Sequence, residues 1–185
     1  WLYLFGSSTD GQVGGNNFAV YPDPQLEAGN VRKVSCGEEH TLILFESGAV
    51  TALGNNGEKQ INGTGLIRTP NQVTLFNSGI RDIACGDLQS FVIKDDLTLW
   101  GTGNNEFGQI GIAPAGGTVA GWTQIDTDVL AVFAGRNNTV YIKRDRSLWG
   151  MGMAEYLGTR FPADQVFETP QRIAENIATA ALGNL

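Results

Sequence analysis

The chain has 185 residues, 25 of them glycine, and a formal charge of −7, because 19 Asp and Glu outnumber 12 Lys and Arg. An acidic chain lacks the basic surface that displaces counterions from phosphates, so we expect no nucleic-acid partner. Its apolar runs are of strand length, well short of the ~20 residues of a membrane helix, so we expect a soluble protein without membrane insertion or a targeting segment. With one histidine and two cysteines, we also expect no metal site and no cofactor.

The first predicted element is a strand in WLYLFG (1–6), and a glycine-rich turn follows it. From residue 31 the sequence repeats. VRKVSCGEEHTLIL (31–44), IRDIACGDLQSFVI (80–93) and VLAVFAGRNNTVYI (129–142) align without gaps at a spacing of 49 residues. Gly54, Gly103 and Gly152 keep the same spacing, and Gly6 lies 48 residues before the first of them. The period therefore identifies a repeat protein.

Each unit predicts four short strands, because alternating apolar residues are punctuated by Gly, Asn and Asp. The first strand ends at Cys36, Cys85 or Ala134, and the second covers 41–45, 90–94 or 139–143. The third carries a tryptophan, in 97–101 and 147–150, and a glycine that we expect to allow positive φ in the following turn. The fourth contains the pieces 69–73, 122–125 and 169–173.

The predicted fold class is therefore all-β: a β-propeller of four-stranded antiparallel blades with about 49 residues per repeat. We expect a single propeller array over 1–185. Its units are a partial blade at 1–30, three full units at 31–79, 80–128 and 129–176, and the start of a next blade at 177–185.

The motif residues also carry a family resemblance. An apolar strand ending in Cys-Gly or Ala-Gly, a polar residue before Thr or Ser, and then LWGTGNNEFGQIG (99–111) resemble the regulator of chromosome condensation repeat. The resemblance covers essentially the whole chain, although 153–156 depart from the Asn-Asn pattern. It implies a propeller, usually of seven blades, whereas this chain holds about 3.8 repeats. We expect the ring to be completed by further sequence of the same protein or by another chain.

Residue types that could support catalysis have simpler structural explanations. His40, the only histidine, aligns with Gln89 and Asn138, so we expect a hydrogen-bonding role near the start of its strand rather than acid–base chemistry. Cys36 and Cys85 hold equivalent positions, and we expect them to be buried free thiols. Asp96 precedes Leu-Thr-Leu-Trp and fits a turn. The sequence therefore predicts no enzyme.

Surface variation indicates where the repeats differ in their contacts. Four positions that follow the repeat glycine by four residues carry Asp10, Glu58, Phe107 and Tyr156. Glu106 and Glu155 precede the two aromatic residues, and such aromatic-acidic pairs suit a protein interface, although packing between blades would explain them too. We take these six residues as candidate binding residues.

The favoured function is a non-enzymatic protein-interaction or scaffold module with protein partners. Two alternatives follow from the family resemblance: a guanine-nucleotide exchange factor for a small GTPase, or a secreted propeller that inhibits an enzyme. No residue here matches the loop carboxylates that nucleotide exchange needs.

Overall fold

The computed structural model describes residues 1–14, 20–63, 68–158, 161–162 and 164–181. Within these ranges the only regular element that is not a strand is a short 3-10 helix, η1 (Ala154–Leu157). The strands are β1 (Leu2–Ser7), β2 (Val20–Ala28), β3 (Val31–Cys36), β4 (His40–Phe45), β5 (Val50–Asn55), β6 (Arg68–Phe76), β7 (Ile80–Cys85), β8 (Gln89–Lys94), β9 (Leu99–Asn104), β10 (Thr118–Asp126), β11 (Val129–Ala134), β12 (Asn138–Lys143), β13 (Leu148–Met153) and β14 (Val166–Ala174).

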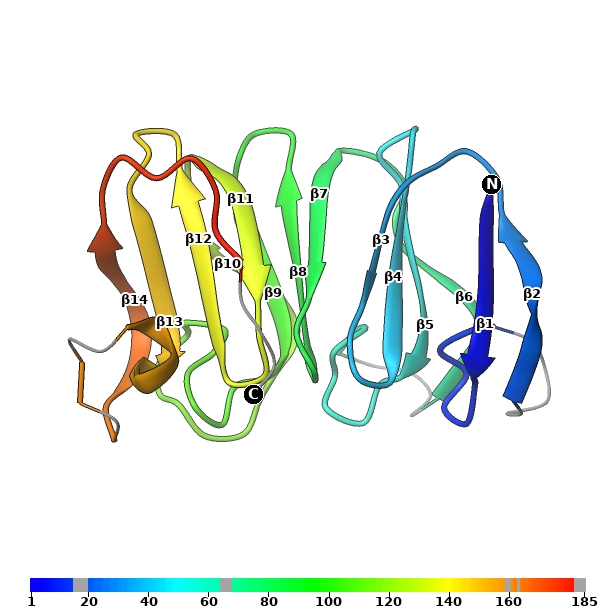
Figure 1. The fold of residues 1–185 in the computed structure, drawn as a ribbon, viewed down its shortest axis with the longest axis horizontal. Coiled ribbons are helices and arrows are strands. Elements are labelled where there is room, and N and C mark those ends of the chain that lie inside the picture. Colours follow the sequence, from blue (N-terminus) through cyan, green and yellow to red (C-terminus); the bar gives the residue numbers. More distant parts are fainter. Residues whose placement is uncertain (15–19, 64–67, 159–160, 163, 182–185) are drawn as a thin grey trace.

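The strands form three four-stranded sheets, β3–β6, β7–β10 and β11–β14, and a two-stranded sheet, β1–β2. All neighbours within a sheet are antiparallel and consecutive in sequence, so each sheet is a simple meander. Figure 1 shows the sheets standing side by side, with β1 and β2 at one end. The predicted all-β propeller architecture is confirmed, and the sheets of the described residues form an open arc rather than a closed ring.

The third strand of the second complete blade differs from its prediction for a backbone reason. Leu97 has a φ of +65°, which places it in the preceding turn, and β9 instead runs from Leu99 through Gly103. Gly103 therefore lies inside the strand, at a φ of +115°. A Cβ on Gly103 would lie 2.5 Å from the carbonyl oxygen of Leu88, immediately before β8, so glycine is required for close approach as well as for φ.

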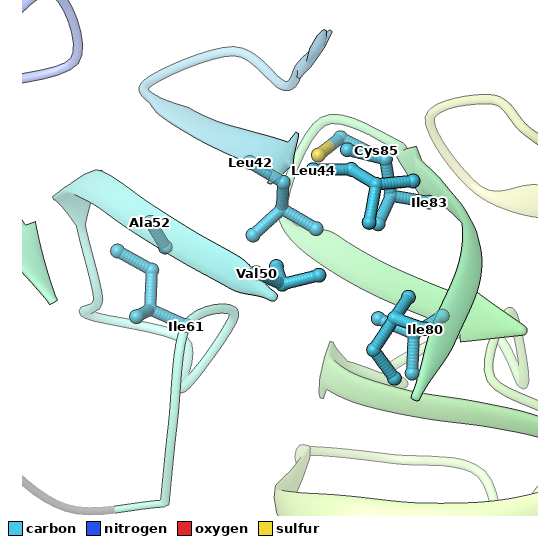
Figure 2. Packing of buried hydrophobic residues seen from close by; sticks show 9 residues of the cluster. Leu42, Leu44, Val50, Ala52, Ile61, Ile80, Ile83 and Cys85 are labelled. Atoms are coloured by element: carbon cyan, nitrogen blue, oxygen red, sulfur yellow. The ribbon is translucent and has the colours of Figure 1, made fainter. Parts of the chain in front are cut away.

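Two apolar cores fill the space between consecutive blades. The first joins β4 and β5 to β7 and β8, as Figure 2 shows. The second joins β8 and β9 to β11, β12 and β13. Trp100 packs against the first core and Trp149 against the second, so both tryptophans lie between blades. Each blade is thus stabilised mainly by its neighbours rather than by a core of its own.

Polar bonds repeat along the same interfaces. The hydroxyl of Thr41 in β4 donates to the carbonyl of Gln12 in the preceding sheet's loop at 2.8 Å. The equivalent Thr139 in β12 donates to the carbonyl of Gln109 at 2.9 Å. These bonds fix the height of one blade against the next, which places the loops of all blades at common ends of the arc.

Candidate functional site

Loops from neighbouring blades gather at one end of the arc, the lower end in Figure 1. Because the strands alternate in direction, the loops between first and second strands (37–39, 86–88 and 135–137) meet there with those that follow the third strands. We call this end the loop face. It carries all six residues that the sequence singled out as binding candidates.

The loops after β1, β5 and β9 share one internal geometry. The side-chain oxygen of a glutamine accepts the backbone N–H of the residue two positions earlier, at 3.0 Å for Asp10, 2.9 Å for Glu58 and 2.9 Å for Phe107. The fourth copy has no glutamine, and η1 takes the place of this loop. In these three loops the same bond therefore holds the backbone of the variable position, and the side chain that it carries differs from blade to blade.

Asp10 and Glu58 link neighbouring blades. Asp10 is buried, and its carboxylate accepts a bond from the Asn55 amide at 3.3 Å. Glu58 accepts the equivalent bond from Asn104, also at 3.3 Å. These two candidates thus lie between blades, where packing alone explains their identity.

Phe107 departs from this arrangement. It occupies the position of Asp10 and Glu58, but the residue equivalent to Asn55 and Asn104 in the next blade is Met153. Phe107 is partly exposed and its neighbour Glu106 is exposed. Glu155 is exposed as well, whereas the side chain of Tyr156 lies outside the described residues.

Glu106 and Phe107 line a cavity of about 320 Å³ whose walls come from the second and third complete blades and from Glu38 of the first. Its lining residues are Glu38, Asp87, Leu88, Asn104, Glu106, Phe107, Gln109, Arg136 and Asn137. An adjoining cavity of about 530 Å³ shares Glu38 and Asp87 and extends past the ends of the innermost strands β3, β7 and β11. The structure thus brings two of the six candidates together in a hollow.

The cavity has a mostly negative wall. Three carboxylates, Glu38, Asp87 and Glu106, face one cation, Arg136, whose guanidinium lies 3.7 Å from Asp87. The Arg136 side chain is 65% exposed, so this ion pair is solvated and weak. The loops that carry Glu38, Asp87 and Arg136 were missed by the sequence reasoning. The signal was present, because the three residues are 49 positions apart and change charge beside an unchanging glycine.

The residues considered for catalysis take structural roles. His40 is buried and bonds through Nε2 to the Ser90 hydroxyl of the next blade at 2.8 Å, rather than to backbone near its own strand. Burial lowers the pKa of His40 to about 4, so the ring is neutral at pH 7. The Asp96 carboxylate accepts bonds from the backbone N–H and the hydroxyl of Thr98, which closes the expected turn.

The two cysteines differ from each other. Cys85 is buried, and this burial raises the pKa of its thiol to about 12, so it is no nucleophile. Cys36 is exposed, contrary to the expectation from the repeat. Among the described residues no group of three or more His, Cys, Asp or Glu side chains is placed to hold a metal ion. No helix in these same ranges is long and apolar enough to cross a membrane.

Comparison with known proteins finds matches to one repeat family. Two family profiles, both described as "Regulator of chromosome condensation (RCC1) repeat", match residues 2–44 and 31–60. The X-linked retinitis pigmentosa GTPase regulator of Mus musculus is 38% identical over an alignment 64 residues long, which covers 32% of this chain and 6% of that protein. The human protein of the same name gives the same values. The chain thus spans a small part of these curated relatives.

Solved propellers resemble the whole arc. Human WBSCR16 superposes with a TM-score of 0.82 at 24% identity, over 98% of this chain and 52% of that one. Prp20p from Saccharomyces cerevisiae, studied for its binding to Gsp1p and histones, gives 0.74 at 19% identity, over 90% and 45%. At these identities the likeness shows the fold. The chain spans about half the length of each of these structures.

Proposed function

Because this chain is a β-propeller arc built of regulator of chromosome condensation repeats, we propose that it is a non-enzymatic protein-binding module whose partner contacts the loop face. The contact centres on the cavity beside Glu106 and Phe107. A partner side chain enters this cavity, and the surrounding loops form the polar rim.

The single observation that carries this proposal is the position of Phe107. In two other blades the same position bears a carboxylate bonded across the blade interface. Phe107 has no carboxylate to make that bond. It lines the cavity instead, and its aromatic side chain is partly exposed. Aromatic anchors with polar surroundings dominate the binding energy of protein interfaces.

The test compares the intact chain with Phe107→Ala and Glu106→Gln variants as bait. Partners retained by the intact chain are identified by mass spectrometry, and their dissociation constants are then measured by titration calorimetry. We expect Phe107→Ala to weaken binding about tenfold or more, since a central aromatic anchor contributes at least about 1.4 kcal/mol. Unchanged affinity of the folded Phe107→Ala variant for every retained partner contradicts the proposal.

A matched control distinguishes loss of a contact at the loop face from a general effect of removing negative charge. Asp95 is exposed in the turn between β8 and β9, at the opposite end of the arc, so Asp95→Asn removes the same charge as Glu106→Gln. We expect Asp95→Asn to bind as the intact chain does. Thermal denaturation of all three variants confirms that weakened binding does not reflect unfolding.

A second candidate is regulation of a small GTPase, which is favoured by the curated relative described as a GTPase regulator. Its test is the rate of nucleotide release from a panel of small GTPases with and without this chain. Acceleration that the Glu106→Gln and Phe107→Ala variants lose supports this second function on the same face. Absence of acceleration leaves the binding module without exchange activity.

A further inference from the structure

The cavity beside Phe107 carries more negative than positive charge. Its lining holds the carboxylates of Glu38, Asp87 and Glu106 but a single cation, Arg136. Within the part of the chain that the structure describes, the carboxylates of Glu38 and Glu106 have neither a hydrogen bond nor an ion pair. Carboxylates around a partly enclosed space focus the field there and raise the local concentration of cations. The cavity therefore favours a positively charged group.

The spacing of these carboxylates determines which cation fits. In the described ranges no three His, Cys, Asp or Glu side chains are placed to hold a metal ion, so the three carboxylates do not coordinate one bare ion together. A guanidinium is extended and planar, and its five N–H donors can reach separate acceptors. The cavity volume of about 320 Å³ is near the lower end of the range for ligand pockets, about 300–1,000 Å³, which suits one side chain.

Arg136 shows where a guanidinium is accommodated. Its Nε lies 3.7 Å from the Asp87 carboxylate, which is longer than a hydrogen bond. The Gln89 amide donates to the carbonyls of Gly135 and Arg136 at 2.7 and 3.2 Å, so the backbone of this loop is fixed although the Arg136 side chain is exposed. An exposed ion pair of this kind contributes little free energy. A second guanidinium can therefore displace Arg136 from Asp87 at little cost.

Phe107 adds an aromatic wall to the charged one. Its backbone N–H donates to the Gln109 side chain at 2.9 Å, and the Gln109 amide donates to Asn104 at 2.7 Å. The ring is thus carried on a hydrogen-bonded loop, and it is partly exposed where it lines the cavity. A guanidinium binds favourably against the face of an aromatic ring as well as to carboxylates. The lining therefore combines the two features that recognise arginine.

We propose that the cavity receives an arginine side chain of the protein partner, which displaces Arg136 from Asp87 and stacks on Phe107. The incoming guanidinium donates to the cavity carboxylates, and the Arg136 side chain turns toward solvent. This inference rests on the proposed protein-binding function and specifies the chemistry that the partner presents. The segment of the partner that enters the cavity is basic, which complements the formal charge of −7 on this chain.

The experiment uses a short blocked peptide of glycine and serine with arginine at its centre as the probe. It is titrated into the isotopically labelled intact chain, and the backbone amide signals are followed by NMR. We expect saturable shifts confined to the cavity loops 86–88, 104–109 and 135–137. The matching citrulline peptide has the same shape without the charge and should bind at least about tenfold more weakly. The lysine peptide should bind at least about threefold more weakly, because an ammonium lacks the planar donors.

Charge variants of the chain test the direction of the effect. Glu38→Gln and Glu106→Gln should each weaken binding of the arginine peptide by about threefold or more. Arg136→Gln should strengthen it by about threefold, because the competing guanidinium is removed. Arg144→Gln removes the same charge from the turn between β12 and β13, at the opposite end of the arc, and should leave binding unchanged. Thermal denaturation checks that each variant is folded.

The outcomes distinguish this inference from the function on which it rests. The arginine assignment is overturned by equal binding of the arginine peptide and either comparison peptide, by shifts outside the cavity loops, or by weaker binding to Arg136→Gln. Loss of partner binding in Phe107→Ala then still supports a protein interface, one that takes a different group in the cavity. Partners whose affinity is unaffected by Phe107→Ala overturn the interface and the arginine inference together, even where the free peptide binds.

Discussion

His40 makes the stability of this chain depend on pH in a way that one substitution removes. The imidazole is fully buried between two blades, where Nε2 meets the hydroxyl of Ser90. Its counterpart in the next unit, Gln89, donates from its amide to the carbonyl of Gly135 at 2.7 Å. His40→Gln therefore replaces a titratable side chain with one that the same interface already uses, and Gly86 supplies the matching carbonyl.

The magnitude follows from the two pKa values. Burial lowers the pKa of His40 from 6.5 to about 4, so the unfolded chain binds a proton that the folded chain excludes between these values. Stability from this group is thus fully present above the unfolded pKa and falls as the pH drops through 6.5 toward 4. The loss amounts to about 2 kcal/mol between pH 7.5 and 5.0, and to about 3 kcal/mol once the folded chain is protonated too.

The assay is urea denaturation followed by circular dichroism at pH 7.5, 6.5, 5.5 and 5.0, for the intact chain and for His40→Gln. Carboxylates titrate alike in both, so the difference between their free energies of unfolding isolates His40. We expect this difference to move by about 2 kcal/mol in favour of His40→Gln as the pH falls. A difference that stays constant to within about 0.5 kcal/mol refutes the reasoning, because it means that the buried ring is not the source of the acid sensitivity.

Two further predictions concern the contacts between and within blades. Gly103→Ala should lower the free energy of unfolding by about 3 kcal/mol or more, because the new Cβ meets the Leu88 carbonyl. Gly116 has a similar φ of +108° but lies in open space, so Gly116→Ala should lower it by only about 1–2 kcal/mol. Equal losses for the two variants in thermal denaturation contradict the close-approach argument. Tyr141→Phe removes the 2.6 Å bond from a buried hydroxyl to the Asp126 carboxylate and should destabilise by about 1.5–3 kcal/mol, measured by urea denaturation at pH 7; a loss below about 0.5 kcal/mol rules out a contribution from that bond.

The fold was predictable because the sequence repeats at a constant period. Aligned strands and glycines at a spacing of 49 residues predict a four-stranded repeat unit, and the structure contains that unit. Strand ends were less predictable. The fourth strands are nine residues long, yet their sequence signal covers only part of each, because pairing with the third strand orders backbone that has no apolar pattern of its own.

The candidate site was only partly predictable. The repeat position that varies lies on the loop face, but sequence could not separate Asp10 and Glu58, which bond across a blade interface, from Phe107, which lines a cavity. That distinction depends on the residue in the neighbouring blade, 46 or 45 positions away. The exposure of Cys36 was equally hidden, since the equivalent Cys85 has the same place in the repeat and is buried.

The one-sided attachment of β1 and β2 has a consequence for the order in which the arc comes apart. Among the described residues, the sheet β7–β10 has a packed neighbour on both faces, whereas β1–β2 is coupled on one face only, through bonds such as Thr41 to Gln12 and Gln72 to Glu27. In a linear array each unit opens with a free energy set by its neighbours. Amide protons of β8 should therefore exchange with solvent at the slowest rate and those of β1 at the fastest, so that the chain frays from its first sheet inward rather than melting as one body.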